Sequence, residues 1–346
     1  MSDFLGMRPW VVFLGRHINL VTGVPNLKSC TPVIKNCMKI YVDKMKPNTD
    51  KQFTKERSDF LSQGVRCSGY LYHPINQNKP DIIIVMAHGF GGDTSLRLSN
   101  FAETFVQHSM SVYMFDYRTF GESDGEPRQY VNPFCHIQDW KNAIDHVRTM
   151  PNEIFKKIVL WGTSFSGGHV LSLAAQDHDI SAVIAQVPFV DGLSSSLMSG
   201  INTILNGLIA SMRDYFHWIT WRKPYYIPIV GFENQFAALN AKDCLESFKA
   251  LILQDSKWEN KVTARSLSLI PLYWPWIHSK KIQCPVLIIA AKHDSLISIH
   301  SIKWTASLIK QCNLIEMDCN HFDPYTGHYF SKNISYQLTF LKSTFR

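Results

Sequence analysis

The chain has 346 residues, of which 45% are hydrophobic and 18% are charged. This composition excludes a disordered chain, a collagen and a coiled coil, and it supplies enough apolar material for a large core. The net charge of +7 comes from scattered lysines and arginines, without a basic tract. We therefore expect no nucleic-acid partner.

The cysteines and the N-terminal residues indicate which cellular compartment and which cofactors to expect. The eight cysteines show no CxxC pair and no zinc-ligand spacing, so we expect no metal, no other cofactor, and thiols in a reducing compartment. No apolar run is long enough to predict a transmembrane helix. Residues 4–42 contain no acid, as transit peptides do, but they include prolines and few serines. We expect a cytoplasmic protein, with organellar targeting by residues 1–42 as the minor alternative.

The order of the predicted elements indicates an α/β fold. Residues 1–52 lack periodicity and are read as an N-terminal extension, and residues 53–74 predict two short strands with a turn at 62–64. Buried strands are then expected at 81–87, 111–117, 156–162, 180–187, 285–291 and 313–318. Helices are expected at 94–110, 132–150, 165–176, 300–310 and 331–343. This alternation predicts a doubly wound, mostly parallel sheet.

One long segment interrupts the alternation. Residues 191–280 hold five of the nine tryptophans and no convincing strand. Because the segment is too long for an irregular loop, we predict a helical cap inserted between two core strands. The predicted organisation is thus an extension (1–52), a first core part (53–190), the cap (191–280) and a second core part (281–346).

The segment WGTSFSGG (161–168) lies where a buried strand must turn sharply into a helix. A serine in such a turn stands above the sheet as a nucleophile, provided that the residues two positions away are small. Gly162 and Ser166 meet this condition, so Ser164 is the predicted nucleophile. The alternatives are a Gly/Ser-rich turn that only caps the helix, or Ser166 as the nucleophile, although its hydroxyl would point along the helix.

A nucleophilic serine needs a base and an acid that orients the base. Asp294 follows the strand at 285–291, and His321 follows the strand at 313–318. Both positions fall at the carboxyl edge of a parallel sheet, and the order Ser164, Asp294, His321 suits a serine on a strand-to-helix turn. The competing residues are Asp323, Asp191 and His293.

Two backbone N–H groups are candidates for binding a developing oxyanion. One belongs to Phe165, directly after the nucleophile, and the other to Phe90 in the loop HGFGG (88–92). The glycines would let the backbone approach a substrate closely. Alone, this loop could also be an ordinary glycine-rich turn. His88 is predicted to hold the loop.

Five sequence segments together resemble the α/β-hydrolase superfamily: AHGFGG, FDYRTFGESDGEPR, WGTSFSGG, AAKHDSLIS and CNHFDPY. The chain is similar in particular to dienelactone-hydrolase-like and Xaa-Pro-dipeptidyl-peptidase-like members and to fungal polyketide transferases. The resemblance covers residues 53–346. It implies Ser164 as nucleophile, Asp294 as acid, His321 as base, and Phe90 and Phe165 as oxyanion donors, without a cofactor.

These features predict a serine hydrolase that cleaves a carboxylic ester or thioester through an acyl-enzyme. The expected partner is a small-molecule acyl substrate with apolar character. An acyltransferase that uses the same intermediate is the main alternative. A peptidase and a non-catalytic binding protein with this fold are weaker ones. The sequence makes no prediction about oligomeric state.

Overall fold

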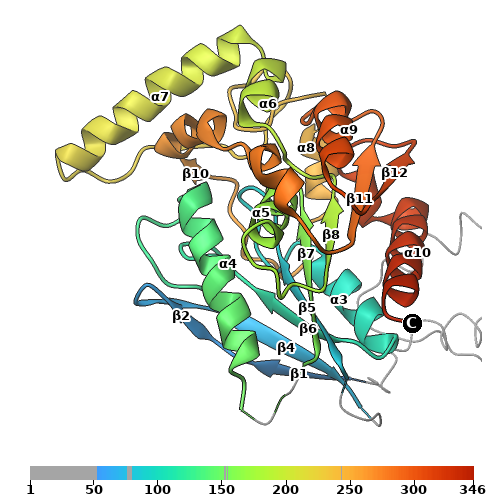
Figure 1. Ribbon diagram of the computed structural model, residues 1–346. Coiled ribbons are helices and arrows are strands. Elements are labelled where there is room, and N and C mark those ends of the chain that lie inside the picture. Colours follow the sequence, from blue (N-terminus) through green and yellow to red (C-terminus); the bar gives the residue numbers. More distant parts are fainter. Residues whose placement is uncertain (1–52, 76–79, 152, 154, 243) are drawn as a thin grey trace, which may run out of the picture. The chain divides into compact units, whose positions relative to one another are not determined.

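The computed structural model describes residues 53–346, apart from residues 76–79, 152, 154 and 243 (Figure 1). The predicted N-terminal extension and its possible targeting role lie outside the described residues. Eight of the described strands form one sheet in the order β1-β4-β6-β5-β7-β8-β11-β12. These strands are β1 (Phe53–Arg57), β4 (Gly69–Pro74), β6 (Ser111–Phe115), β5 (Ile82–Ala87), β7 (Lys157–Thr163), β8 (Ala182–Gln186), β11 (Val286–Ala291) and β12 (Cys312–Met317).

The sheet is parallel from β6 to β12, whereas β1 and β4 are added antiparallel at one edge. Strands β6, β8 and β11 are buried along their whole length. A strand covered on both faces has a continuous apolar run and no alternation, which explains why these strands could be recognised in the sequence. The predicted mostly parallel α/β sheet is confirmed.

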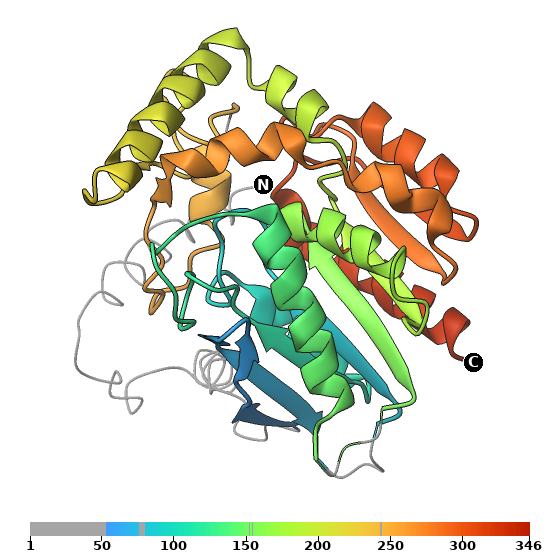
Figure 2. The same ribbon diagram turned by 60° about the vertical axis from the view of Figure 1, so that its left-hand side comes forward.

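Helices cover both faces of the sheet. Helices α3 (Leu98–Gln107) and α10 (Gly327–Thr344) pack together on one face, and α4 (Pro133–Arg148) and α5 (Phe165–Ala174) pack together on the other (Figures 1 and 2). Helix α9 (Ile299–Leu308) contacts β11 and β12. Helix α4 begins where predicted because the Asn132 side chain accepts the N–H groups of Phe134 and Cys135, and Pro133 suits the first turn.

The prediction of two strands in residues 53–74 is wrong, because the structure has four. Between β1 and β4 lies a hairpin of β2 (Phe60–Ser62) and β3 (Val65–Cys67), whose turn at Gln63 and Gly64 was predicted correctly. Each hairpin strand has only three residues, too few for a recognisable alternation. Strands β1 and β4 pair with each other around this hairpin, from Phe53 opposite Pro74 to Arg57 opposite Tyr70.

Strands β8 and β11 are direct neighbours in the sheet, so the chain between them is an insertion. We call residues 191–281 the inserted segment. It contains α6 (Gly192–Met198), α7 (Ile201–Ile219), α8 (Cys244–Lys249), the 3-10 helices η2 (Ala264–Leu272) and η3 (Pro275–Lys281), and the short antiparallel strands β9 (Tyr226–Ile227) and β10 (Val262–Thr263). The two-residue strands were not predicted. The division into a core and a separate cap domain stays a prediction.

None of the helices within the described part of the chain is both long and apolar enough to cross a membrane.

Candidate active site

Ser164 stands in a sharp turn between β7 and α5. Its backbone angles are φ 53° and ψ −119°, a conformation that residues with a side chain rarely adopt. The turn is also tight. A Cβ atom on Gly162 would lie 2.3 Å from the carbonyl oxygen of Ser166, so only glycine fits there. Ser164 therefore has the strand-to-helix geometry predicted from the sequence, and it is partly exposed.

The structure brings Ser164, His321 and Asp294 into one chain of hydrogen bonds. The Ser164 Oγ lies 3.1 Å from His321 Nε2, and His321 Nδ1 lies 2.6 Å from Asp294 Oδ2. The other carboxylate oxygen of Asp294 accepts the N–H groups of Leu296 and Ile297 at 2.8 and 2.9 Å. The acid and the imidazole are almost wholly buried, with side chains 0% and 3% exposed. Both are thus held in one orientation.

The competing residues have other partners. The hydroxyl of Ser166 is fully buried and accepts a hydrogen bond from Tyr117. Asp323 accepts the N–H of Asn320, Asp191 caps the N-terminus of α6, and the His293 ring pairs with Asp318 at the surface. Within the described part of the chain, none of these four side chains is hydrogen-bonded to the Ser164 hydroxyl.

The HGFGG loop lies against Ser164, the predicted nucleophile, because β5 and β7, which precede the loop and Ser164, are neighbours in the sheet. A Cβ atom on Gly89 would lie 2.9 Å from the Ser164 Cβ. The turn from Gly89 to Gly92 closes through the N–H of Gly92, so it does not require the N–H of Phe90. Phe165 is the first residue of α5, where backbone N–H groups have no partner within the helix.

The rings of Phe90 and Phe165 meet edge to face, with centroids 5.8 Å apart. The two residues whose backbone N–H groups are predicted to bind the oxyanion, Phe90 and Phe165, are therefore neighbours in space. His88 holds the loop as expected, because its Nδ1 accepts the N–H of Gly89 and its Nε2 donates to the carbonyl of Leu96. Burial lowers the pKa of His88 to about 4, so the ring is neutral at physiological pH.

The inserted segment contacts the same loop. The indole N–H of Trp258 donates to the Gly91 carbonyl at 2.7 Å, and the Arg97 Nε donates to the Ala250 carbonyl at 2.7 Å. Ile229 lies against Gly91, where an added Cβ would come within 2.8 Å of its side chain. These tertiary contacts join the HGFGG loop, and Arg97 after it, to the inserted segment, and nothing in the local sequence pattern indicated them.

A buried network of polar side chains lies beneath Ser164 and was also not predicted. Trp161 donates to Gln337 at 2.8 Å, and Gln337 donates to Asn333 at 2.8 Å and to Gln186 at 3.2 Å. Gln186 in turn donates to Thr163, the residue before Ser164, at 3.1 Å. All five side chains are fully buried. The network therefore ties the end of β7 to β8 and α10.

The described residues contain no group of three or more histidine, cysteine or acidic side chains that could hold a metal ion.

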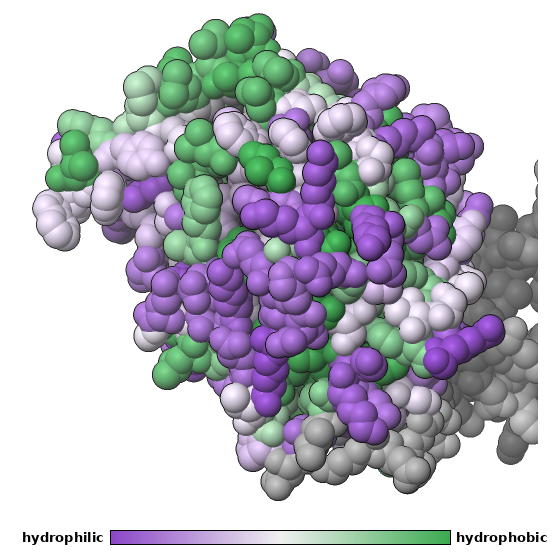
Figure 3. All heavy atoms as spheres, viewed as in Figure 1, coloured by the Kyte–Doolittle hydropathy of each residue, from purple (hydrophilic) through white to green (hydrophobic). Residues whose placement is uncertain are grey.

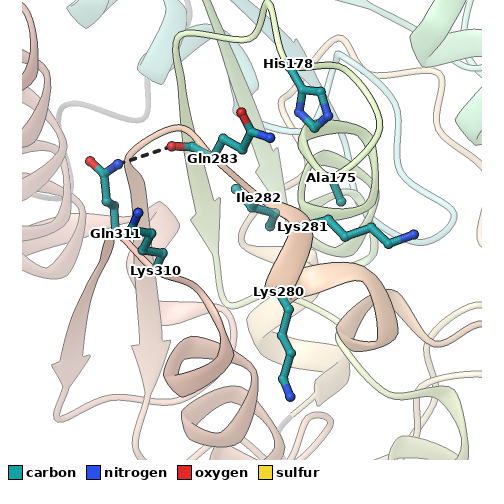
Figure 4. A pocket seen from close by; sticks show the side chains of 8 residues that line it. All are labelled: Ala175, His178, Lys280, Lys281, Ile282, Gln283, Lys310 and Gln311. Atoms are coloured by element: carbon teal, nitrogen blue, oxygen red, sulfur yellow. Dashed lines mark hydrogen bonds between the residues drawn. The ribbon is translucent and has the colours of Figure 1, made fainter.

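A pocket of about 570 Å³ lies at the opposite edge of the sheet, before β11 and β12, and the candidate catalytic residues do not line it (Figure 4). Its lining consists of Ala175, His178, Lys280, Lys281, Ile282, Gln283, Lys310 and Gln311.

The doubly wound sheet with a serine on a strand-to-helix turn defines an α/β hydrolase. Residues 78–316 match the family described as serine aminopeptidase, S33, and the chain belongs to this family of α/β-hydrolase enzymes. The predicted family resemblance is confirmed.

Three known proteins illustrate the relationship. The quorum-quenching protein AidA of Acinetobacter baumannii is 37% identical over 82% of this chain and 93% of its own length. Thiohydrolase aneE of Aspergillus aculeatus is 34% identical over 41% of this chain and 44% of its own. The crystal structure of the α/β hydrolase GrgF from Penicillium sp. sh18 matches with a TM-score of 0.71 and 22% identity, over 84% of this chain and 98% of that one. This last likeness shows the shared fold.

Proposed function

We propose that the protein is a serine hydrolase that cleaves a carboxylic ester or thioester with an apolar acyl group. The observation that carries the proposal is the chain of hydrogen bonds from Asp294 through His321 to the Ser164 hydroxyl. This arrangement supports a catalytic triad, in which the acid would fix the orientation of the imidazole and the imidazole would activate the serine. The name of the thiohydrolase relative adds support for a thioester substrate.

The reaction begins when the Ser164 Oγ attacks the substrate carbonyl and its proton passes to His321 Nε2. The negative oxygen that forms is held by the N–H groups of Phe90 and Phe165, which contributes a factor on the order of 10²–10³ in turnover. As the tetrahedral intermediate collapses, His321 gives its proton to the departing alcohol or thiol. The acyl group stays on Ser164, and His321 then removes a proton from an attacking water to release the acid.

Asp294 stabilises the imidazolium that forms during both steps. It accepts two backbone N–H groups besides the His321 ring, so its carboxylate is well solvated by the protein and cannot rotate away. Neutral His321 with its proton on Nδ1 leaves Nε2 free to accept the serine proton. The geometry therefore favours the tautomer that the first step needs.

Acyl transfer is the second candidate function, since a different nucleophile could replace water in the last step. The names of relatives favour it, because some of them, such as af380 of Aspergillus fumigatus, are polyketide transferases. The two functions differ only in what attacks the acyl-enzyme. Product analysis with and without an alcohol or amine acceptor distinguishes them.

A fluorophosphonate probe and a series of p-nitrophenyl esters and acyl thioesters of graded length test the proposal. We expect labelling of the wild type but not of Ser164→Ala, and a loss of at least about 10³-fold in kcat/KM in that variant. Ser166→Ala is the matched control and should still be labelled. Equal labelling of the wild type and Ser164→Ala would remove Ser164 from the reaction.

A cytoplasmic location also remains part of this proposal. The described cysteines, at positions 67, 135, 244, 284, 312 and 319, are free thiols, and free thiols persist in a reducing compartment. Burial raises the pKa of Cys67, Cys244 and Cys319 to about 12, so these thiols are poor nucleophiles. Their state in cell extracts, measured by thiol alkylation before lysis, checks this expectation.

A further inference from the structure

Helix α7 of the inserted segment turns its apolar side outward. Six apolar side chains follow the 4-3-4-4-3 spacing that puts residues on one side of a helix. Each of the six is 50% exposed or more: Ile201, Leu205, Leu208, Met212, Phe216 and Ile219. We call them the outward stripe. Figure 3 shows the apolar surface over α6 and α7, and Figure 1 shows that α7 projects from the body of the molecule.

The opposite side of α7 is fixed by buried polar contacts, so the helix cannot simply rotate its stripe inward. The Ser211 hydroxyl donates to the carbonyl of Ala264 at 2.8 Å. Asp214 is fully buried and accepts two hydrogen bonds from the Arg265 guanidinium, at 2.8 and 3.1 Å. It also accepts the backbone N–H groups of Tyr225 and Arg265. Turning the stripe inward would expose the side of α7 that carries Ser211 and Asp214, and it would break the ion pair between Asp214 and Arg265.

Such a surface is unusual in a protein that has no partner. A helix on a globular domain ordinarily buries its apolar stripe, and contiguous exposed apolar patches mark sites of interaction. The patch extends beyond α7 to α6, where Leu193, Leu197 and Met198 are also exposed. None of the described residues covers these side chains.

The charges beside the stripe have one sign. Between Gly192 and Lys223 the exposed ionic side chains are Arg213, Arg222 and Lys223, whereas Asp214 is buried. Two tryptophans lie near these cations at the end of α7. Trp218 is largely exposed, and Trp221 is 97% exposed on a left-handed backbone with φ 55°. Tryptophans and cations around an apolar stripe are typical of helices that bind the surface of a bilayer.

We propose that the outward stripe of α7, with its tryptophans and flanking cations, docks this protein on an anionic lipid bilayer. Charge complementarity favours a bilayer over a second copy of the chain. Two α7 helices packed stripe to stripe would bring cations together without an exposed acid to pair with them. Anionic headgroups supply the missing negative charge, and acyl chains accept the apolar side chains of a projecting helix. This docking is independent of the chemistry at Ser164.

Vesicle sedimentation tests the proposal with the full-length chain carrying Ser164→Ala, so that no lipid is hydrolysed. The vesicles consist of phosphatidylcholine, with or without phosphatidylserine. We expect stronger binding to the vesicles that contain phosphatidylserine, and weaker binding as salt is added. Leu208→Ser combined with Met212→Ser should lower the partition coefficient at least about ten-fold on both vesicles.

Two further variants separate the apolar from the ionic contribution. Arg222→Gln with Lys223→Gln should weaken binding to phosphatidylserine vesicles by about five-fold per cation and leave phosphatidylcholine vesicles unaffected. Leu61→Ser is the matched control, because Leu61 is 68% exposed on the β2–β3 hairpin away from α7. It should bind like the parent chain.

The proposal fails if the parent chain stays in the supernatant with both vesicles, or if the stripe variant binds as the parent does. It also fails if light scattering shows a dimer that the stripe variant converts to a monomer while vesicle binding is unchanged. Circular dichroism of each variant confirms that the substitutions, all at exposed positions, leave the fold intact.

Discussion

The sheet edge around Ser164 and the inserted segment around α7 use buried polar groups in different ways. Beneath Ser164, neutral amides and hydroxyls from several strands and a helix join in one network, and apolar side chains surround them. Under α7, the ion pair between Asp214 and Arg265 and the hydrogen bond from Ser211 to the Ala264 carbonyl fix a helix whose apolar side faces out. The comparison teaches that a few buried polar contacts can decide which way an element faces, even against its hydrophobic pattern.

The largest effect is expected in the inserted segment, from Asp214→Ala. This change leaves the buried Arg265 charge without its partner, which costs about 3–5 kcal/mol. Urea unfolding monitored with limited proteolysis of the inserted segment measures the loss. The double variant Asp214→Leu with Arg265→Met removes both charges and should regain part of it. If Asp214→Ala is as stable as the wild type, the ion pair does not fix α7.

The next largest effect is a loss of activity, expected from Gly89→Ala at the sheet edge around Ser164. In Gly89→Ala the new methyl group would lie 2.9 Å from the Ser164 Cβ and 3.0 Å from the Thr163 carbonyl oxygen. We expect kcat/KM to fall by about 10²-fold, because small displacements of reacting groups are costly. Gly207→Ala in α7 is the control, since its methyl would meet only the end of the Leu267 side chain, at 3.2 Å. Similar losses in both variants would contradict the assigned site.

A smaller effect on stability is expected from Gln337→Leu. This substitution removes the acceptor of the Trp161 indole N–H and the Gln337 donor to the Asn333 Oδ1, inside the core. The expected loss is about 1–3 kcal/mol in the free energy of unfolding. Gln311→Leu, at an exposed position, should stay within about 0.5 kcal/mol of the wild type. Equal values for the two variants would show that the network adds no stability.

The smallest effect at neutral pH is expected from His136→Phe. The buried His136 ring stacks on Tyr117 with centroids 3.9 Å apart, and neither ring nitrogen has a hydrogen-bond partner among the described residues. Burial lowers the pKa of His136 to about 3. Between that value and the ordinary 6.5, the unfolded chain binds a proton that the folded chain does not. Stability from this group is therefore complete above pH 6.5 and is lost as the pH falls.

Phenylalanine should remove this dependence while preserving the stacking. We expect the stability of His136→Phe to fall less steeply on acidification, by up to about 1.4 kcal/mol per pH unit relative to the wild type. Asp116 acts in the opposite sense, because burial and Asp93 raise its pKa to about 7. Asp116 is present in both the wild type and His136→Phe, so its contribution to the pH dependence of stability cancels when the two are compared. Parallel pH profiles from urea unfolding would contradict the assignment.

Several features of the site were predictable because they depend on local patterns and on one property of parallel sheets. The carboxyl ends of adjacent parallel strands meet at one edge, so residues that follow β5, β7, β11 and β12 had to gather there. Asp294 and His321 could therefore be placed beside Ser164 from their positions after buried runs. The hairpin of β2 and β3 was missed because strands of three residues carry no periodic signal.

The buried partners could not be predicted in the same way. Gln186 and Gln337 are separated by 151 residues, and an isolated glutamine in a sequence ordinarily indicates an exposed side chain. The contact between Trp258 and the Gly91 carbonyl joins residues 167 positions apart. No local spacing in the sequence distinguishes such residues from solvated ones. The pairs are therefore recognisable only in the folded structure.

Strand and helix order, the sharp turn at Ser164 and the positions of Asp294 and His321 all follow from short stretches of the chain, since burial and backbone sterics act over a few residues. The outward direction of α7 does not. Its spacing of apolar residues is equally suited to a helix that faces a core. The direction was settled by Arg265, which lies 51 residues beyond Asp214 and pairs with it inside the fold. A buried charge must be paired, and that requirement outweighs the preference of one helix face for the interior.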